Sequence, residues 1–171
     1  MAPNIEIKAR IESVSALMLK VSKLASEGPF EIDQDDTFFY CPNGRLKLRT
    51  FSQKSGELIF YRRSDQTGPK KTFYMISQTS SPDILQDLLT LAYGQAGRVR
   101  KKRTVYMVGR TRVHLDRVQG LGDFLELEVP LSDSESNETG MAEAYCLMAP
   151  LGISTSQFIE GAYLDLLATP G

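Results

Sequence analysis

The sequence is poor in the residues that usually build disulfides, thiolate metal sites and catalytic triads. It contains two cysteines and one histidine in 171 residues. Cys41 and Cys146 show no metal-ligand spacing, and we expect them to be reduced thiols of a cytoplasmic protein. His114 has no evident partner, so it does not indicate a triad and is more typical of a structural residue. No apolar run is long enough to span a bilayer, so we expect no membrane partner.

The chain also lacks the excess of positive charge that marks a general nucleic-acid binder. Its formal net charge is -1, with 24% charged and 42% hydrophobic residues. These values are typical of a soluble globular protein, and the length suits one domain over residues 1–171. Residues 98–117 are nevertheless rich in Lys and Arg, whereas residues 123–143 carry acids and no base. A local anion site is therefore allowed, without a specific nucleic-acid partner.

Alternation of polar and aliphatic residues is the strongest pattern in the sequence. Successive side chains of a strand point to opposite faces, so such a segment has one ionic and one apolar face. Four segments share the pattern: residues 5–11, 45–50, 98–106 and 110–129. On their ionic faces we place Glu6, Lys8, Arg10, Arg45, Lys47, Arg49, Arg98, Arg100, Lys102, Arg110, Arg112, His114, Asp116, Glu126 and Glu128. Either the sheet has a strongly charged outer surface, or these side chains surround a ligand.

Amphipathic helices complete the expected fold. Helical spacing predicts helices that begin after Ser13, after Ser81, after Ser132 or Ser134, and at residue 156. About eight strands, joined mostly by hairpins, fill the rest. Closing such a sheet removes its edges and leaves an interior for one small ligand. We therefore predict an α+β fold, a closed eight-stranded antiparallel β-barrel, or tunnel, with a charged interior and several helices covering its aliphatic outside.

A tunnel lined by ions needs an ionic ligand, because unpaired buried charges are costly. The cations are too many for one carboxylate and suit a chain of phosphates. The acids would repel that anion unless a divalent cation, Mg²⁺ or Mn²⁺, lay between. The sequence therefore favours a metal-bound small-molecule polyphosphate such as a triphosphate. The expected phosphate ligands are Lys8, Arg45, Lys47, Arg49, Arg62, Arg100, Lys102 and Arg112, and the expected metal ligands are Glu6, Asp116, Glu126 and Glu128.

The order of the motifs resembles one known family. IEIKAR, GRLKLR, RKKR, HLDRVQGLGDFLELEV and a closing LGI to AYLDLL segment are similar to motifs of the CYTH superfamily of triphosphate tunnel enzymes, over almost the whole chain. That superfamily includes class IV adenylate cyclases, thiamine triphosphatases and inorganic or RNA-end triphosphatases. The resemblance implies a tunnel in which bases hold the triphosphate and acids hold the metal. Arg62 and Arg63 could exchange roles, as could Lys101 and Lys102, because a bulge of one residue turns a strand face over.

The chain departs from the family's opening Glu-x-Glu-x-Lys motif, because Asn4 stands in place of the first Glu. Asparagine offers a carbonyl oxygen without charge, so a second metal would be held less well. We expect a metal-dependent enzyme that hydrolyses the P–O–P linkage of a nucleoside, thiamine or inorganic triphosphate. Its expected catalytic residues are Glu6, Lys8, Glu126 and Glu128. The alternative is a cyclase that converts ATP to cyclic AMP and pyrophosphate, and a third hypothesis is a non-catalytic polyphosphate binder.

Overall fold

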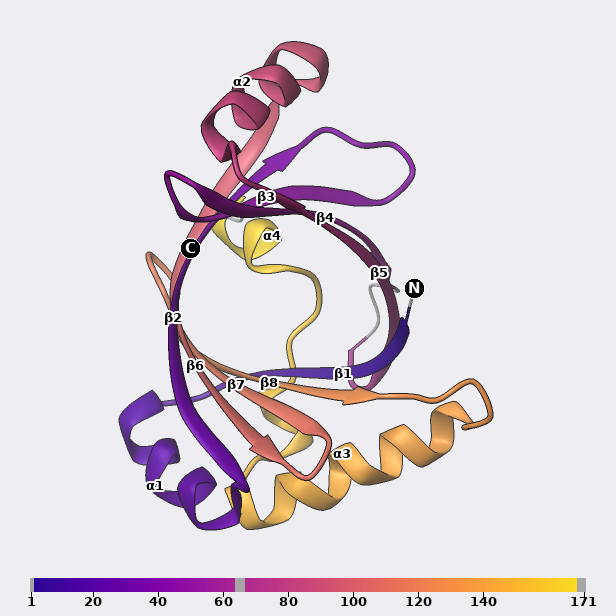
Figure 1. Cartoon of the computed structure of the whole chain (residues 1–171). Coiled ribbons are helices and arrows are strands. Elements are labelled where there is room, and N and C mark those ends of the chain that lie inside the picture. Colours follow the sequence, from indigo (N-terminus) through magenta and orange to yellow (C-terminus); the bar gives the residue numbers. More distant parts are fainter. Residues whose placement is uncertain (1, 64–66, 169–171) are drawn as a thin grey trace.

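Eight antiparallel strands form one closed ring, which confirms the predicted tunnel. The structure is a computed structural model that describes residues 2–63 and 67–168. Each strand pairs with two neighbours, in the ring order β1-β5-β4-β3-β2-β6-β7-β8, and β8 pairs with β1 (Figure 1). The strands are β1 (Ala2–Arg10), β2 (Glu27–Phe39), β3 (Arg45–Ser52), β4 (Ser55–Arg63), β5 (Lys70–Thr79), β6 (Gln95–Val108), β7 (Thr111–Val118) and β8 (Gly122–Pro130).

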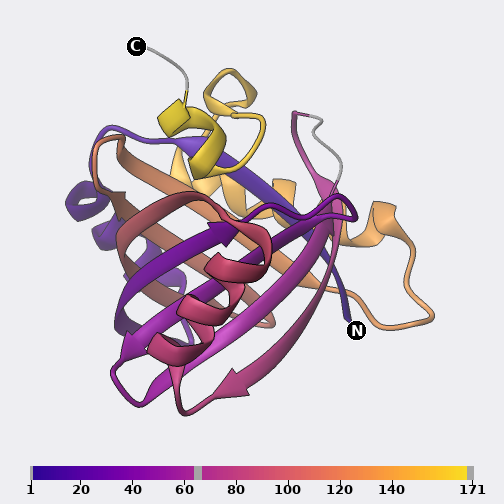
Figure 2. The same cartoon turned by 90° about the horizontal axis from the view of Figure 1, so that it is seen from above.

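Helices cover parts of the outside of the ring. Within the described residues these are α1 (Val14–Leu24), α2 (Pro82–Tyr93) and α3 (Asn137–Leu151). The short α4 (Tyr163–Ala168), which follows a 3-10 turn at Thr155–Gln157, lies at one end of the tunnel instead. Helices α1 and α3 pack against β1 and β6 to β8, and α2 lies against β2, β3 and β4 (Figures 1 and 2). None of the described helices is both long enough and apolar enough to cross a membrane.

The aliphatic faces of the strands look outwards and form the main core beneath α1 and α3. Ile5 of β1 and Leu127 of β8 are fully buried there, in one cluster with Val21 of α1 and Met148 of α3. Each such side chain contributes roughly 1.5–3 kcal/mol on burial. Because these residues face out, the charged residues that alternate with them must face in.

Helix beginnings follow the predicted signals only in part. Ser13 caps α1, since its side chain accepts a hydrogen bond from the backbone N–H of Ala16. Ser81 makes no side-chain cap bond, although α2 begins directly after it as predicted, with Pro82 in the first turn. The predicted start of α3 at Ser132 or Ser134 is corrected to Ser136, whose side chain accepts from Thr139 N–H. The segment before it folds into a turn instead.

The C-terminal segment lies at one end of the tunnel, and the short helix predicted from residue 156 begins only at Tyr163. Phe158 pairs with Ala9 of β1, and the N–H of Ile159 donates to the carbonyl of Lys8. These bonds hold the segment extended, and helix resumes only at Tyr163. The ring of Tyr163 lies 4.9 Å from that of Phe124. In Figure 1 the yellow segment accordingly passes within the outline of the ring.

Candidate functional site

The inward-facing side chains enclose one cavity of about 470 Å³. This volume is in the range of about 300–1,000 Å³ that small-molecule sites occupy. All eight strands contribute to its walls, so the ionic faces converge on a shared space. Its charged lining consists of Glu6, Lys8, Asp36, Lys47, Arg49, Glu57, Arg63, Lys101, Arg103, Arg112, Glu126 and Glu128.

The structure brings most of the predicted site residues into this lining. They are Glu6, Lys8, Lys47, Arg49, Arg112, Glu126 and Glu128. The inward placement of Arg100 is corrected, because Arg100 is outside the lining. For the two pairs whose roles the sequence left exchangeable, the structure places Arg63 and Lys101 in the lining and leaves Arg62 and Lys102 outside it. The side chains of two adjacent strand residues point to opposite faces, so only one of each pair can reach the cavity.

Two further predicted residues have inward phase but lie outside the cavity lining. One guanidinium nitrogen of Arg45 donates to both carboxylate oxygens of Asp165 in α4, at 2.8 and 2.7 Å. Asp116 is fully buried and accepts two hydrogen bonds from Arg103, both at 2.7 Å. Tyr163 donates a third bond to Asp116, at 2.8 Å. Asp116 therefore holds Arg103 and Tyr163 in place, and its predicted role as a metal ligand stays a prediction.

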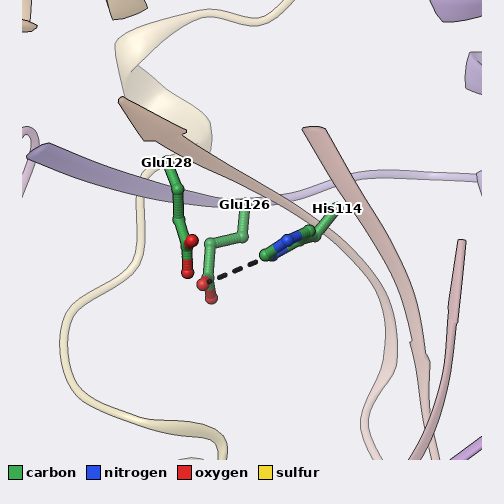
Figure 3. Close-up of side chains that lie close together, drawn as sticks. All are labelled: His114, Glu126 and Glu128. Carbon is green, nitrogen blue, oxygen red and sulfur yellow. Dashed lines mark ion pairs between the residues drawn. The ribbon is translucent and has the colours of Figure 1, made fainter. Parts of the chain in front are cut away.

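An acidic group with one imidazole lies on the β7–β8 wall (Figure 3). His114 stands opposite Glu126 in the strand register, and Glu6 of β1 stands opposite Glu128. One ligand atom each from His114, Glu126 and Glu128 lie within 4.8 Å of one another. Sequence reasoning missed His114, because a single histidine at a strand position shows no metal-ligand spacing.

Electrostatics of the acidic group fit a divalent cation. Burial raises the pKa of Glu6 to about 7, and the negative charges of Glu126 and Glu128 add to the shift. Buried carboxylates crowded in this way gain from a cation between them. His114 Nδ1 is buried and has no hydrogen-bond partner among the described residues, so it too can accept a bond from a ligand. The residues present therefore fit a metal ion.

The raised pKa of Glu6 predicts how the stability of the metal-free protein depends on pH. A carboxyl whose pKa is higher in the folded than in the unfolded chain stabilises the fold as the pH falls between the two values. Between about pH 8 and pH 6 we expect the unfolding free energy in EDTA to rise by about 1 kcal/mol more in the wild type than in Glu6→Gln. Urea unfolding at the two pH values measures this, and a wild-type rise no larger than that of the variant would contradict it.

Cations on the β2, β3, β4 and β6 side are held in place by buried acids. Asp36 is 1% exposed and pairs with Lys47 at 3.0 Å and with Arg49 at 2.8 Å. Burial alone would raise the pKa of Asp36, but the two cations hold it far below its usual range. Arg63 lies 3.6 Å from Glu6. These pairs keep long side chains ordered at the cavity wall before any ligand arrives.

Lys101 is the exception among these cations. It is 8% exposed, and within residues 2–63 and 67–168 no acid lies at ion-pair distance from it. Burial, and then repulsion from Arg103, lower the pKa of Lys101 well below its ordinary value. The Lys101 amine lies 5.0 Å from the centre of the Tyr163 ring. Since no carboxylate pairs with it, this amine is open to an anionic ligand in the cavity.

Comparisons with known proteins agree with this fold. The model of the CYTH domain family matches residues 2–163. Adenylate cyclase CyaB from Aeromonas hydrophila is 26% identical over 171 residues, covering 95% of this chain and 87% of that protein. The PH1012 protein from Pyrococcus horikoshii OT3 has a TM-score of 0.85 at 21% identity, covering 96% of this chain and 99% of that one. HpAC1 from Hippeastrum, an adenylyl cyclase candidate described as having a dominant triphosphatase activity, has a TM-score of 0.68 at 18% identity, covering 96% of this chain and 95% of that one. The chain therefore belongs to the CYTH domain family.

Proposed function

We propose that the protein binds a small-molecule triphosphate in its tunnel and cleaves the P–O–P linkage by metal-dependent hydrolysis. The observation that carries the proposal is the division of one enclosed cavity into two parts. Glu6, His114, Glu126 and Glu128 lie on the arc formed by β1, β7 and β8. Most of the cations lie on β3 and β4, across the ring from that arc, and on β6, which is next to β7 (Figure 1). A metal-bound polyphosphate complements such a division, because it presents both a cation and a chain of anionic oxygens.

Each part of the cavity has a distinct task in this proposal. Lys101, Arg63 and Arg103 contact phosphate oxygens and hold the chain of phosphates in line for attack by water. Lys8, which lies 3.5 Å from Glu126, supplies positive charge where the two parts meet. A divalent cation, Mg²⁺ or Mn²⁺, held by Glu6, Glu126 and Glu128 would neutralise charge on the phosphoryl oxygens. Tyr163 closes the tunnel end and limits entry of bulk water.

Cyclisation of ATP is the second candidate reaction, favoured by the name of the Aeromonas relative. It would use the same cation and phosphate contacts, with the ribose 3'-hydroxyl in place of water. The deciding experiment incubates pure protein with ATP, tripolyphosphate and thiamine triphosphate, each with Mg²⁺ or Mn²⁺, and identifies the products. We expect orthophosphate. Cyclic AMP with pyrophosphate would select the cyclase, and thermal stabilisation by tripolyphosphate without any product would select a binder.

Adjacent lysines of β6 provide a matched test of the phosphate contacts. Lys101 lies in the cavity lining and Lys102 is exposed outside it. We expect Lys101→Ala to lower kcat/KM for the cleaved triphosphate by about tenfold to hundredfold, because it removes a charge-assisted contact in a buried site. Lys102→Ala should stay within about twofold of the wild type, as an exposed charge is screened by solvent.

Arg63 and Arg62 repeat this test on β4. Arg63 lies in the lining, whereas Arg62 donates to the backbone carbonyl of Asn43 outside it. Steady-state kinetics of the four alanine variants, with circular dichroism to verify folding, compare the inward and outward faces directly. Equal losses of kcat/KM in the inward and outward variants would contradict the placement of the triphosphate in the tunnel.

A further inference from the structure

We propose that His114 is a nitrogen ligand of the metal and makes the site select a first-row transition ion over Mg²⁺. The inference rests on the proposed function, since it concerns the ion of the same cavity. The carboxylates alone do not determine which ion binds, and His114 would decide between the ions.

The first observation is the unsatisfied imidazole nitrogen. The His114 side chain is only 7% exposed, and its Nδ1 lies 3.7 Å from Glu126 Oε1, beyond hydrogen-bond distance. No other described group bonds to this nitrogen. A buried polar atom left without a partner is costly, so such an atom in a native site calls for a ligand. Figure 3 shows the imidazole directed towards Glu126.

The second observation is the spacing of the group. Ligand atoms of His114, Glu126 and Glu128 lie within 4.8 Å of one another. Two atoms bound to one ion at about 2.0–2.2 Å are at most about 4.4 Å apart. Side-chain rotations that move these ligand atoms by a few tenths of an ångström therefore allow all three residues to bind one ion. The backbone need not move, because His114 and Glu126 are already opposite each other in the β7–β8 ladder.

The third observation concerns Asp116, the acid on the same face of β7 as His114, and excludes it as a ligand of the metal. Asp116 has the same phase as His114, but its oxygens accept bonds from Arg103 and Tyr163. Recruiting Asp116 to a metal would leave the buried guanidinium of Arg103 without its bidentate partner. β7 therefore offers the metal an imidazole and not a carboxylate.

Ligand chemistry turns this placement into selectivity. Mg²⁺ prefers six oxygen ligands in near-ideal octahedral geometry, whereas imidazole suits Fe²⁺, Ni²⁺, Cu²⁺ and Zn²⁺ best. A site with one nitrogen and two or three carboxylates thus discriminates against Mg²⁺. Mn²⁺ is the most demanding probe of this selectivity. Among the first-row ions its ligand preference is nearest to that of Mg²⁺, and its paramagnetism lets a nitrogen ligand be detected directly.

The experiment uses electron spin-echo spectroscopy of Mn²⁺ bound to the untagged protein. His114 is the only histidine in the chain, so imidazole nitrogen coupling can come from no other residue. We expect ¹⁴N modulation that changes to the ¹⁵N pattern when histidine is ¹⁵N-labelled, and that is lost in His114→Gln. Bound Mn²⁺ without such coupling overturns the inference, and so does failure to bind Mn²⁺ both alone and with tripolyphosphate.

Affinities for the two ions give an independent readout. The affinities are measured by titrating Mg²⁺ against bound Mn²⁺ and following the Mn²⁺ resonance. His114→Gln should weaken the affinity for Mn²⁺ by about tenfold and change the affinity for Mg²⁺ by less than about twofold. His114→Asp, which restores an all-oxygen set, should shift the preference towards Mg²⁺. Equal weakening of both ions in His114→Gln would contradict selectivity. Triphosphate cleavage is assayed separately, so nitrogen-bound Mn²⁺ without cleavage refutes only the proposed function, and cleavage without nitrogen coupling refutes only the role of His114.

Discussion

Glu126→Gln is expected to lower kcat/KM for triphosphate cleavage by about 10²–10³-fold while leaving the fold intact. Glu126 is buried among Lys8, Arg103 and His114, at 3.5, 4.0 and 3.7 Å. Burial alone would raise the pKa of Glu126. Its charged neighbours, of which Lys8 has the largest effect, instead hold this pKa well below its usual range. The carboxylate is therefore ionised at neutral pH, where it can bind a divalent cation. Glutamine keeps the shape and removes the charge.

The fold should persist, because glutamine keeps the side-chain volume and the variant removes one of the charges that crowd Glu6. Lys8 loses its ion-pair partner, so we expect a lower unfolding temperature without loss of the folded state. The control is Glu57→Gln, an isosteric change at a residue that lines the same cavity but lies outside the group of His114, Glu126 and Glu128. Initial rates with saturating Mn²⁺ and thermal unfolding of both variants make the comparison. A Glu126→Gln enzyme with wild-type kcat/KM would refute the assignment of this carboxylate.

Asp116→Ala is expected to destabilise the protein by about 3–5 kcal/mol, because it leaves the buried guanidinium of Arg103 unpaired. It also removes the hydrogen bond that Tyr163 donates at the closed end of the tunnel. Arg103 and, through it, the cation wall would lose their fixed position. Urea unfolding followed by circular dichroism measures the change in free energy.

Asp35→Ala provides the matched control, since Asp35 also forms a bidentate pair with an arginine of β6, Arg98. That pair is on the surface, with side chains 32% and 55% exposed, and pairs of this kind contribute only about 0–1 kcal/mol. Burial would raise the pKa of Asp116, but Arg103 holds it well below its ordinary value. The stabilisation is thus complete above the unfolded-state pKa and is lost only as the pH falls through the lower folded-state value. A loss at neutral pH no larger than that of Asp35→Ala would contradict the structural role.

Strict alternation allowed β1 and β8 to be placed from sequence. Ile5, Ile7 and Leu127 leave no doubt about the outer face, so Glu6 and Glu128 had to face inwards. The run of cations in β6 has no such marker, because both faces carry Lys or Arg. Its phase is set by Tyr106, which packs into the outer core and so turns Arg100 and Lys102 outwards with it.

Other features depend on contacts that are distant in the chain. β2 carries polar residues on both faces, and only pairing with β3 and β6 selects Asp36 for the interior. The alternation of residues along β7 correctly placed Asp116 and His114 on the same face. It does not show which of the two lies deeper along the tunnel axis. That choice is made by Tyr163, 47 residues further on, which bonds to Asp116 and leaves His114 in the metal group.

A crystal structure of the protein with tripolyphosphate and Mn²⁺ tests most directly whether the tunnel is the binding site. Anomalous scattering locates the ion, and difference density locates the phosphates. We expect the ion between Glu126 and Glu128 and the phosphate chain against Lys101 and Arg63 inside the cavity. Phosphates bound to the outward Arg100 and Lys102, with no ligand in the tunnel, would contradict the account.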